Sequence, residues 1–120
     1  MITKISNVVL YVADQQRSVD FYVKGLGFEL ATDAEMGPGA RWIEVVPPGA
    51  ETRFTLCDAA HFETTPGSST PPTLSCDDVH STYETLKANG VEVSEPVTEP
   101  WATWIKVTDP DGHEFVVSAA

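Results

Sequence analysis

Hydrophobic positions near the start of the chain follow first a strand period and then a helix period. Residues 5–12, ISNVVLYV, are rich in β-branched side chains and predict a strand. Within residues 15–25, apolar side chains recur at the i, i+3, i+4 and i+7 spacing of one helix face. Asp14 is the expected N-cap. Gly25 and Gly27 are expected to end this helix, because glycine tolerates a left-handed backbone.

The rest of the chain continues with strands and then repeats the strand–helix–strand order. Pro- and Gly-rich turns separate the predicted strands, and a segment rich in Thr, Ser, Pro and Gly indicates a linker. A second amphipathic pattern follows a pair of aspartates, either of which suits an N-cap. The predicted elements are strands at 28–36, 41–47 and 51–58, a linker at 59–71, a strand at 72–76, a helix at 79–89 capped by Asp77 or Asp78, and strands at about 91–95, 101–107 and 113–118.

The two halves of the chain are similar in sequence. VADQQRSVDFYVKGLGFEL (12–30) aligns with CDDVHSTYETLKANGVEV (76–93), and ARWIEV (40–45) shares four of six residues with ATWIKV (102–107). Self-similarity at one offset indicates a duplicated unit. We therefore predict an α+β fold of two βαβββ modules, whose mixed sheets form a concave cleft. Residues 1–120 are expected to form one domain, with modules at 1–58 and 72–120 joined by the linker.

Composition narrows the classes of partner. The net charge is −11, which disfavours nucleic acid and mildly favours cationic ligands, although acidity also serves solubility alone. No apolar run approaches the 18 residues of a membrane span, and the first residues lack the features of a signal peptide. We expect a cytoplasmic protein in which Cys57 and Cys76 are more plausible as free thiols than as a disulfide.

Three segments together resemble the vicinal oxygen chelate superfamily of glyoxalase I, extradiol dioxygenases, fosfomycin-resistance and bleomycin-resistance proteins. They are ISNVVLYVADQQRSVDFYVKGLGFEL at the start, CDDVHSTYETLKANGVEV in the middle and DPDGHEFVV at the end. The resemblance covers essentially the whole chain and implies the paired-module fold. It leaves the activity open, because one fold can host many chemistries.

The resemblance also implies where a metal would be held. Catalytic members bind one divalent ion with two side chains from each module, and these positions fall on Asn7, Thr55, Pro71 and Val116. An amide, a hydroxyl and two side chains without donors replace the imidazoles and carboxylates that such ions prefer. We therefore expect no metal, no cofactor and no catalytic residue, and whether the protein is an enzyme stays open.

His113 and Glu114 are adjacent potential ligands, but neighbours in a strand point to opposite faces. They are therefore not expected to chelate one ion together. His61 lies in the linker, and His80 lies on the predicted exposed face of the second helix.

Aromatic residues at equivalent positions of the repeat suggest a ligand cleft. Trp42 and Trp104 correspond in the repeat, and strand alternation directs Trp104 away from the helix side. Packing of these rings within the core is an equally weighted interpretation. Cys57 is expected to be a buried, inert thiol beside this cleft. The candidate ligand-binding residues are Asn7, Tyr11, Trp42, Arg53, Thr55, Trp101, Trp104, Glu114 and Val116.

Three functions fit these observations. The first is a metal-free protein of the bleomycin-resistance type, a homodimer with clefts at the subunit junction that sequesters an aromatic or cationic antibiotic-like small molecule. The alternative is a lyase or oxidoreductase of the glyoxalase or dioxygenase class. It would use an unrecognised metal site or acid–base chemistry at Glu114. The third is a regulatory module that binds a protein partner.

Overall fold

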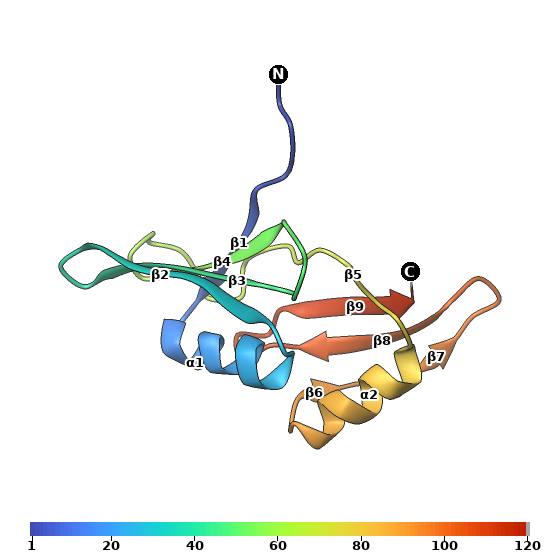
Figure 1. Cartoon of the computed structure of the whole chain (residues 1–120). Coiled ribbons are helices and arrows are strands. Elements are labelled where there is room, and N and C mark those ends of the chain that lie inside the picture. Colours follow the sequence, from blue (N-terminus) through green and yellow to red (C-terminus); the bar gives the residue numbers. More distant parts are fainter. Residues whose placement is uncertain (120) are drawn as a thin grey trace.

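Two mixed β-sheets and two helical segments form the part of the chain that the computed structural model describes, residues 1–119 (Figure 1). The first sheet has the strand order β1-β4-β3-β2, and the second has the order β5-β9-β8-β6 with β7 also paired to β8. These sheets confirm the predicted α+β class. The elements are β1 (Asn7–Val12), α1 (Gln15–Asp20), η1 (Phe21–Gly25), β2 (Glu29–Gly37), β3 (Ala40–Val46), β4 (Arg53–Asp58), β5 (Leu74–Cys76), α2 (Val79–Ala88), β6 (Glu92–Val93), β7 (Val97–Thr98), β8 (Thr103–Thr108) and β9 (Glu114–Ala119).

The first helix has the predicted extent but not a uniform geometry. Asp14 caps it, accepting a hydrogen bond of 3.0 Å from the backbone N–H of Arg17. After Asp20 the chain continues as the π-helical turn η1, and the N–H of Leu26 reaches the carbonyl of Phe21 at 3.1 Å. The hydrophobic spacing gave no sign of this turn, because Tyr22, Val23 and Leu26 all contact the core across it.

In the second half, Asp78 rather than Asp77 caps α2, and its carboxylate accepts the N–H of Ser81 at 2.8 Å. The strand expected at 91–95 is instead two short strands, β6 and β7, which both pair with β8. Pro96 lies between them and lacks a backbone N–H to donate to the ladder. The linker prediction is consistent with the absence of strands and helices from 59 to 71.

Both helices lie on one side of the two sheets, and a single hydrophobic core fills that side (Figure 1). Alternate strand residues such as Ile105 and Val107 are buried there, as predicted from the strand pattern. Rings from the two halves meet in this core, where Phe54 and Phe115 stack with centroids 5.5 Å apart. We call the opposite, helix-free side of the sheets the open side.

A buried carboxylate connects the two halves. Asp109 Oδ2 accepts the hydroxyl of Tyr22 at 2.9 Å and the Nδ1–H of His113 at 2.7 Å. Its Oδ1 accepts the backbone N–H groups of Asp111 and His113. Burial alone would raise the pKa of Asp109, but the hydrogen bonds from His113 and Tyr22 hold that pKa below its ordinary value. Hydrogen bonds to a charged group contribute about 1.5–3 kcal/mol each, so this cluster is a major link.

The turn after Asp109 also binds the first half of the chain. Asp111 Oδ1 accepts the guanidinium of Arg17 and the backbone N–H of Ala13, both at 3.0 Å. Gly67 lies directly on this turn, because a Cβ added to it would be 2.2 Å from the carbonyl oxygen of Asp111. The linker is therefore fixed against both halves at this point.

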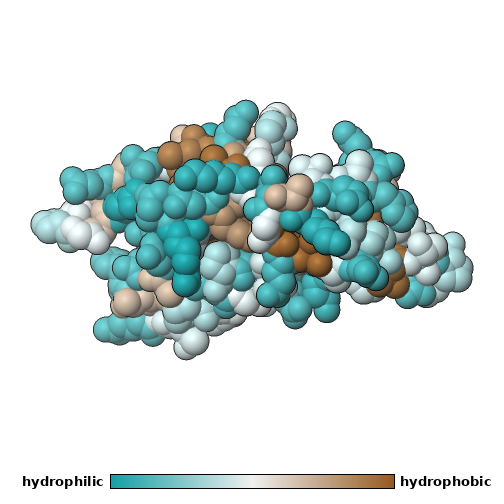
Figure 2. Space-filling model, turned by 90° about the horizontal axis from the view of Figure 1, so that it is seen from below, coloured by the Kyte–Doolittle hydropathy of each residue, from teal (hydrophilic) through white to brown (hydrophobic). Residues whose placement is uncertain are grey.

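Outside the core the helix side is largely hydrophilic, with hydrophobic surface confined to separate small areas (Figure 2). Within residues 1–119, none of the helices is both long and apolar enough to span a membrane. The amino-terminal residues extend away from the sheets on the open side (Figure 1), and Met1, Ile2 and Ile5 are exposed there.

The contact of Gly67 gives a prediction with a matched control. Gly67→Ala and Gly90→Ala both place a side chain at a φ of +80°, but only the first meets another backbone atom. Left-handed backbone costs an alanine about 1–2 kcal/mol, and forced overpacking adds about 1–3 kcal/mol. We expect Gly67→Ala to lower the free energy of unfolding by more than Gly90→Ala in urea titrations. Equal losses of unfolding free energy in the two variants would show that the linker moves away from Asp111 without cost, which would contradict this prediction.

Candidate functional site

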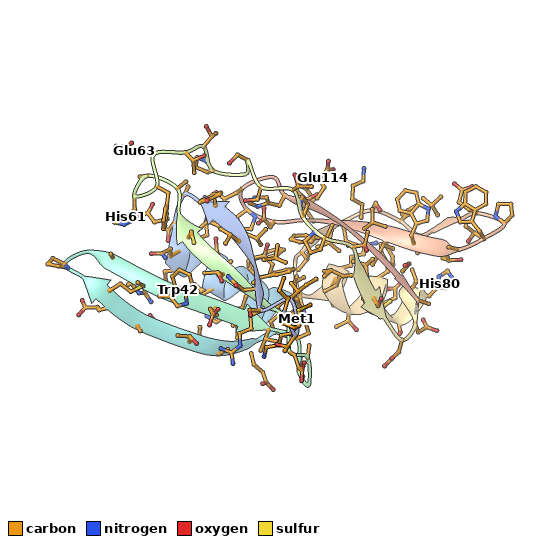
Figure 3. The ribbon with its side chains drawn as sticks, turned by 90° about the horizontal axis from the view of Figure 1, so that it is seen from above. Met1, Trp42, His61, Glu63, His80 and Glu114 are labelled. Carbon is orange, nitrogen blue, oxygen red and sulfur yellow. The ribbon has the colours of Figure 1, made fainter. Side chains whose placement is uncertain are left out.

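The predicted ligand-binding residues lie on the open side, but on two different sheets. Viewed from that side, Trp42 lies at the first sheet and Glu114 at the second (Figure 3). Because both helices occupy the same side, the open faces of the two sheets lie on the same side of the molecule (Figure 1). The first sheet carries Asn7, Tyr11, Trp42, Arg53 and Thr55, and the second carries Trp104, Glu114 and Val116, with Trp101 just before β8.

Each open face contributes its own cavities. Trp42, Cys57 and Phe62 line a cavity of about 160 Å³ on the first sheet. Trp101, Trp104 and Val116 line a shallower cavity of about 410 Å³ on the second sheet. The structure therefore brings the predicted residues together as two groups within one chain.

A polar network that includes an unpredicted residue, Glu44, crosses the first open face. The amide of Asn7 donates to Thr55 Oγ1 at 2.7 Å, and Thr55 Oγ1 lies 3.4 Å from Glu44 Oε2. Glu44 Oε1 accepts the hydroxyl of Thr32 and the guanidinium of Arg53, both at 3.1 Å. Only 13% of the Glu44 side chain is exposed, against 44% for Arg53. The sequence does contain a signal for this residue, because Glu44 is two positions after Trp42 and strand alternation puts both on one face.

The second open face carries an equivalent ion pair with the charges reversed. Lys106 Nζ lies 3.7 Å from Glu114 Oε2. In the repeat, Lys106 corresponds to Glu44, and aligning Phe115 with Phe54 makes Glu114 correspond to Arg53. The strand registers agree, because Glu44 pairs with Thr55 and Lys106 pairs with Val116, the residue aligned with Thr55. The same backbone positions therefore present opposite signs on the two sheets.

The linker adds aromatic rings that the sequence prediction did not include. Phe62 packs edge-on to Tyr11 with centroids 6.0 Å apart, and His61 packs against Phe62 at 5.1 Å. Both linker residues line the Trp42 cavity. Of the predicted tryptophans, Trp42 and Trp104 are half-buried, whereas Trp101 is 80% exposed at the rim.

Cys57 lies at the base of the Trp42 cavity as a free, buried thiol. Burial raises the pKa of this thiol, which lowers the fraction present as the reactive thiolate. This agrees with the expectation of an inert cysteine. Cys76 is also free and is half-buried in β5.

The four positions where relatives of this fold hold a metal do not fit a divalent ion here. Asn7 and Thr55 bond to each other, Pro71 has no donor, and Val116 presents a 36% exposed apolar side chain. Within residues 1–119, no group of three or more His, Cys, Asp and Glu side chains is arranged to hold a metal.

His113 and Glu114 point to opposite sides of the second sheet, as predicted. His113 is buried against Asp109, whereas Glu114 is exposed on the open side. His80 is exposed on α2, as predicted.

Comparison with known proteins places this arrangement in a family. Residues 4–117 match the Glyoxalase/Bleomycin resistance protein/Dioxygenase superfamily, and the chain belongs to it. It is 39% identical over 118 residues to the uncharacterized protein YetH of Bacillus subtilis (strain 168), covering 98% of both chains.

Two solved structures show the same fold. TnmS3, an antibiotic binding protein from Streptomyces sp. CB03234, superposes with a TM-score of 0.86 at 34% identity, covering 98% of this chain and 96% of the other. A member of the superfamily from Sphaerobacter thermophilus DSM 20745 superposes with a TM-score of 0.90 at 34% identity, covering 99% and 98%.

The side chains at the metal positions of the fold, an amide and a hydroxyl among them, predict how much metal the purified protein contains. When it is purified without chelator, elemental analysis should find substoichiometric Zn²⁺, Ni²⁺, Mn²⁺ and Fe²⁺. An amide and a hydroxyl are weak ligands without a carboxylate or imidazole partner. Asn7→Ala and Thr55→Ala should leave the metal content unchanged. One metal per chain that either substitution removes would contradict this prediction.

Proposed function

We propose that the protein binds and sequesters an aromatic or cationic antibiotic-like small molecule without using a metal. The observation that carries this proposal is the pair of tryptophan-bearing open faces, on which the metal positions of the fold hold an amide, a hydroxyl and a valine. Large flat rings supply much of the contact area in such sites. The similarity to TnmS3, an antibiotic binding protein, supports the same function. A cytoplasmic location belongs to this proposal and suits the two free thiols.

A homodimer with two composite sites is the second part of the proposal. Each open face is a half-site, and pairing the first sheet of one copy with the second sheet of its partner would enclose a cleft. Equivalent positions would then face each other across a local two-fold axis, which brings Glu44 toward a Lys106 of opposite charge. Pairing two first sheets would instead oppose Glu44 with itself. Charge complementarity therefore favours pairing of the first sheet of one copy with the second sheet of its partner.

Ligand binding is tested by tryptophan fluorescence with a panel of aromatic and cationic antibiotics. At least one compound should cause saturable quenching, because the half-buried Trp42 and Trp104 line the cavities. Trp104→Ala should weaken its binding about three- to tenfold, the value of one stacked ring. His80→Ala, a substitution of an exposed ring on α2, is the control and should change nothing. Absence of quenching across the panel would oppose the proposed function.

The dimer is tested by light scattering and sedimentation. The unmodified protein should be a dimer, and Lys106→Glu should raise its dissociation constant about tenfold by placing like charges opposite each other. Adding Glu44→Lys to that variant should restore association. Lys87→Glu on α2 makes the same charge change on the helix side and should have no effect. A monomer at micromolar concentration would rule out the composite site.

A further inference from the structure

Glu44 is held in a fixed position on the open face of the first sheet. Three side chains contact it, Thr32 from β2 and Arg53 and Thr55 from β4. Thr32 and Arg53 bond Oε1, while Asn7 of β1 orients Thr55 beside Oε2. Thr55 is fully buried, so this side of the network is rigid. The carboxylate is therefore oriented before any ligand arrives, which lowers the entropy cost of binding.

One acceptor position of this carboxylate remains open. A carboxylate offers about four lone-pair sites in total, two on each oxygen. Oε1 uses both of its sites on Thr32 and Arg53, whereas Oε2 has one long contact of 3.4 Å with Thr55. Glu44 also lines a cavity of about 510 Å³ with Lys4, Ser6 and Arg53. A donor group in that cavity has room to reach Oε2.

Arg53 is the exchangeable member of the network. Its side chain is 44% exposed, and its ion pair with Glu44 is the kind of surface pair that contributes about 0–1 kcal/mol. Only one of its terminal nitrogens, Nη1, bonds to Glu44 and Thr32. An incoming cation can therefore replace Arg53 at Oε1, or bind beside it at Oε2, at small cost.

The aromatic and acidic elements are adjacent on one strand. Trp42 and Glu44 lie on the same face of β3, and residues two apart in a strand are separated by roughly 6–7 Å. Trp42 and Glu44 line separate cavities, so a ligand that reaches both would lie along the strand. An aromatic ring joined to an amine by a two-carbon chain has a length suited to this spacing. The acidic charge of the whole protein, −11, further favours a cation near this face.

We propose that Glu44 is the specificity-determining residue of the binding site, and that it recognises the protonated amine of an arylalkylamine ligand. Arg53 is the cation that competes with that amine for Glu44 in the free protein. The proposal rests on the proposed binding function and names its ligand class.

The test compares two probes that differ only in charge, 2-(1-naphthyl)ethylamine and the neutral 2-(1-naphthyl)ethanol, by isothermal titration calorimetry. The unmodified protein should bind the amine about tenfold more tightly, as one charge-assisted hydrogen bond provides. Glu44→Gln should abolish this preference. Arg53→Met should increase it, because the cation that pairs with this carboxylate within the chain is then removed. A purely structural role of the ion pair would move both variants in the same direction.

The matched control is Glu84→Gln, which removes an exposed carboxylate on α2, on the helix side, and it should leave the preference unchanged. Circular dichroism checks that each variant is folded. The inference is overturned if Glu44→Gln retains the preference, if the alcohol binds as tightly as the amine, or if neither probe binds. Saturable quenching in the antibiotic panel would in each case leave the binding function itself standing.

Discussion

The arrangement of this protein depends on the core that its two halves share on the helix side. Stacking of Phe54 on Phe115 and the bonds of Asp109 to Tyr22 and His113 require both helices to lie on that side. An uncompensated carboxylate in such a position would be costly. Three of the four donors around Asp109 come from its own turn, and the fourth, the Tyr22 hydroxyl, joins that turn to the first half. The two open faces then point the same way, and neither can cover the other within one chain.

The two halves of the repeat carry opposite charges at equivalent positions of their open faces. The core positions keep their character, since Phe54 corresponds to Phe115 and Ile43 to Ile105. On the open faces the backbone and the tryptophans are retained, while Glu44 and Arg53 are replaced by Lys106 and Glu114. In a shared core, a new side chain must match the volume and shape of the one it replaces, whereas on an uncovered face it need not. Chemistry can therefore change there without a loss of fold.

Sequence reasoning predicted the fold well because strand alternation, caps and the repeat are local signals. It predicted the faces of Trp104, Glu114 and Val116 correctly from the period of two. It missed Glu44, because a single glutamate in a strand resembles a solvated one until its partners from β1, β2 and β4 are known. It also missed the break between β6 and β7, because an interruption of strand pairing leaves no periodic pattern in the sequence. It missed the rings of Phe62 and His61 for a similar reason, because the packing of a linker has no period either.

The amino-terminal residues have a practical consequence for anyone who purifies this protein. Ser6 is anchored by the N–H of Arg53 at 3.2 Å, and Lys4 and Ser6 form one wall of the cavity that contains Glu44. A purification tag fused before Met1 would begin three residues before Lys4, on the open side of the sheets. A histidine tag would add imidazoles there, and these could compete for Glu44 or bring a metal of their own. Binding and metal measurements therefore require protein from which such a tag has been removed.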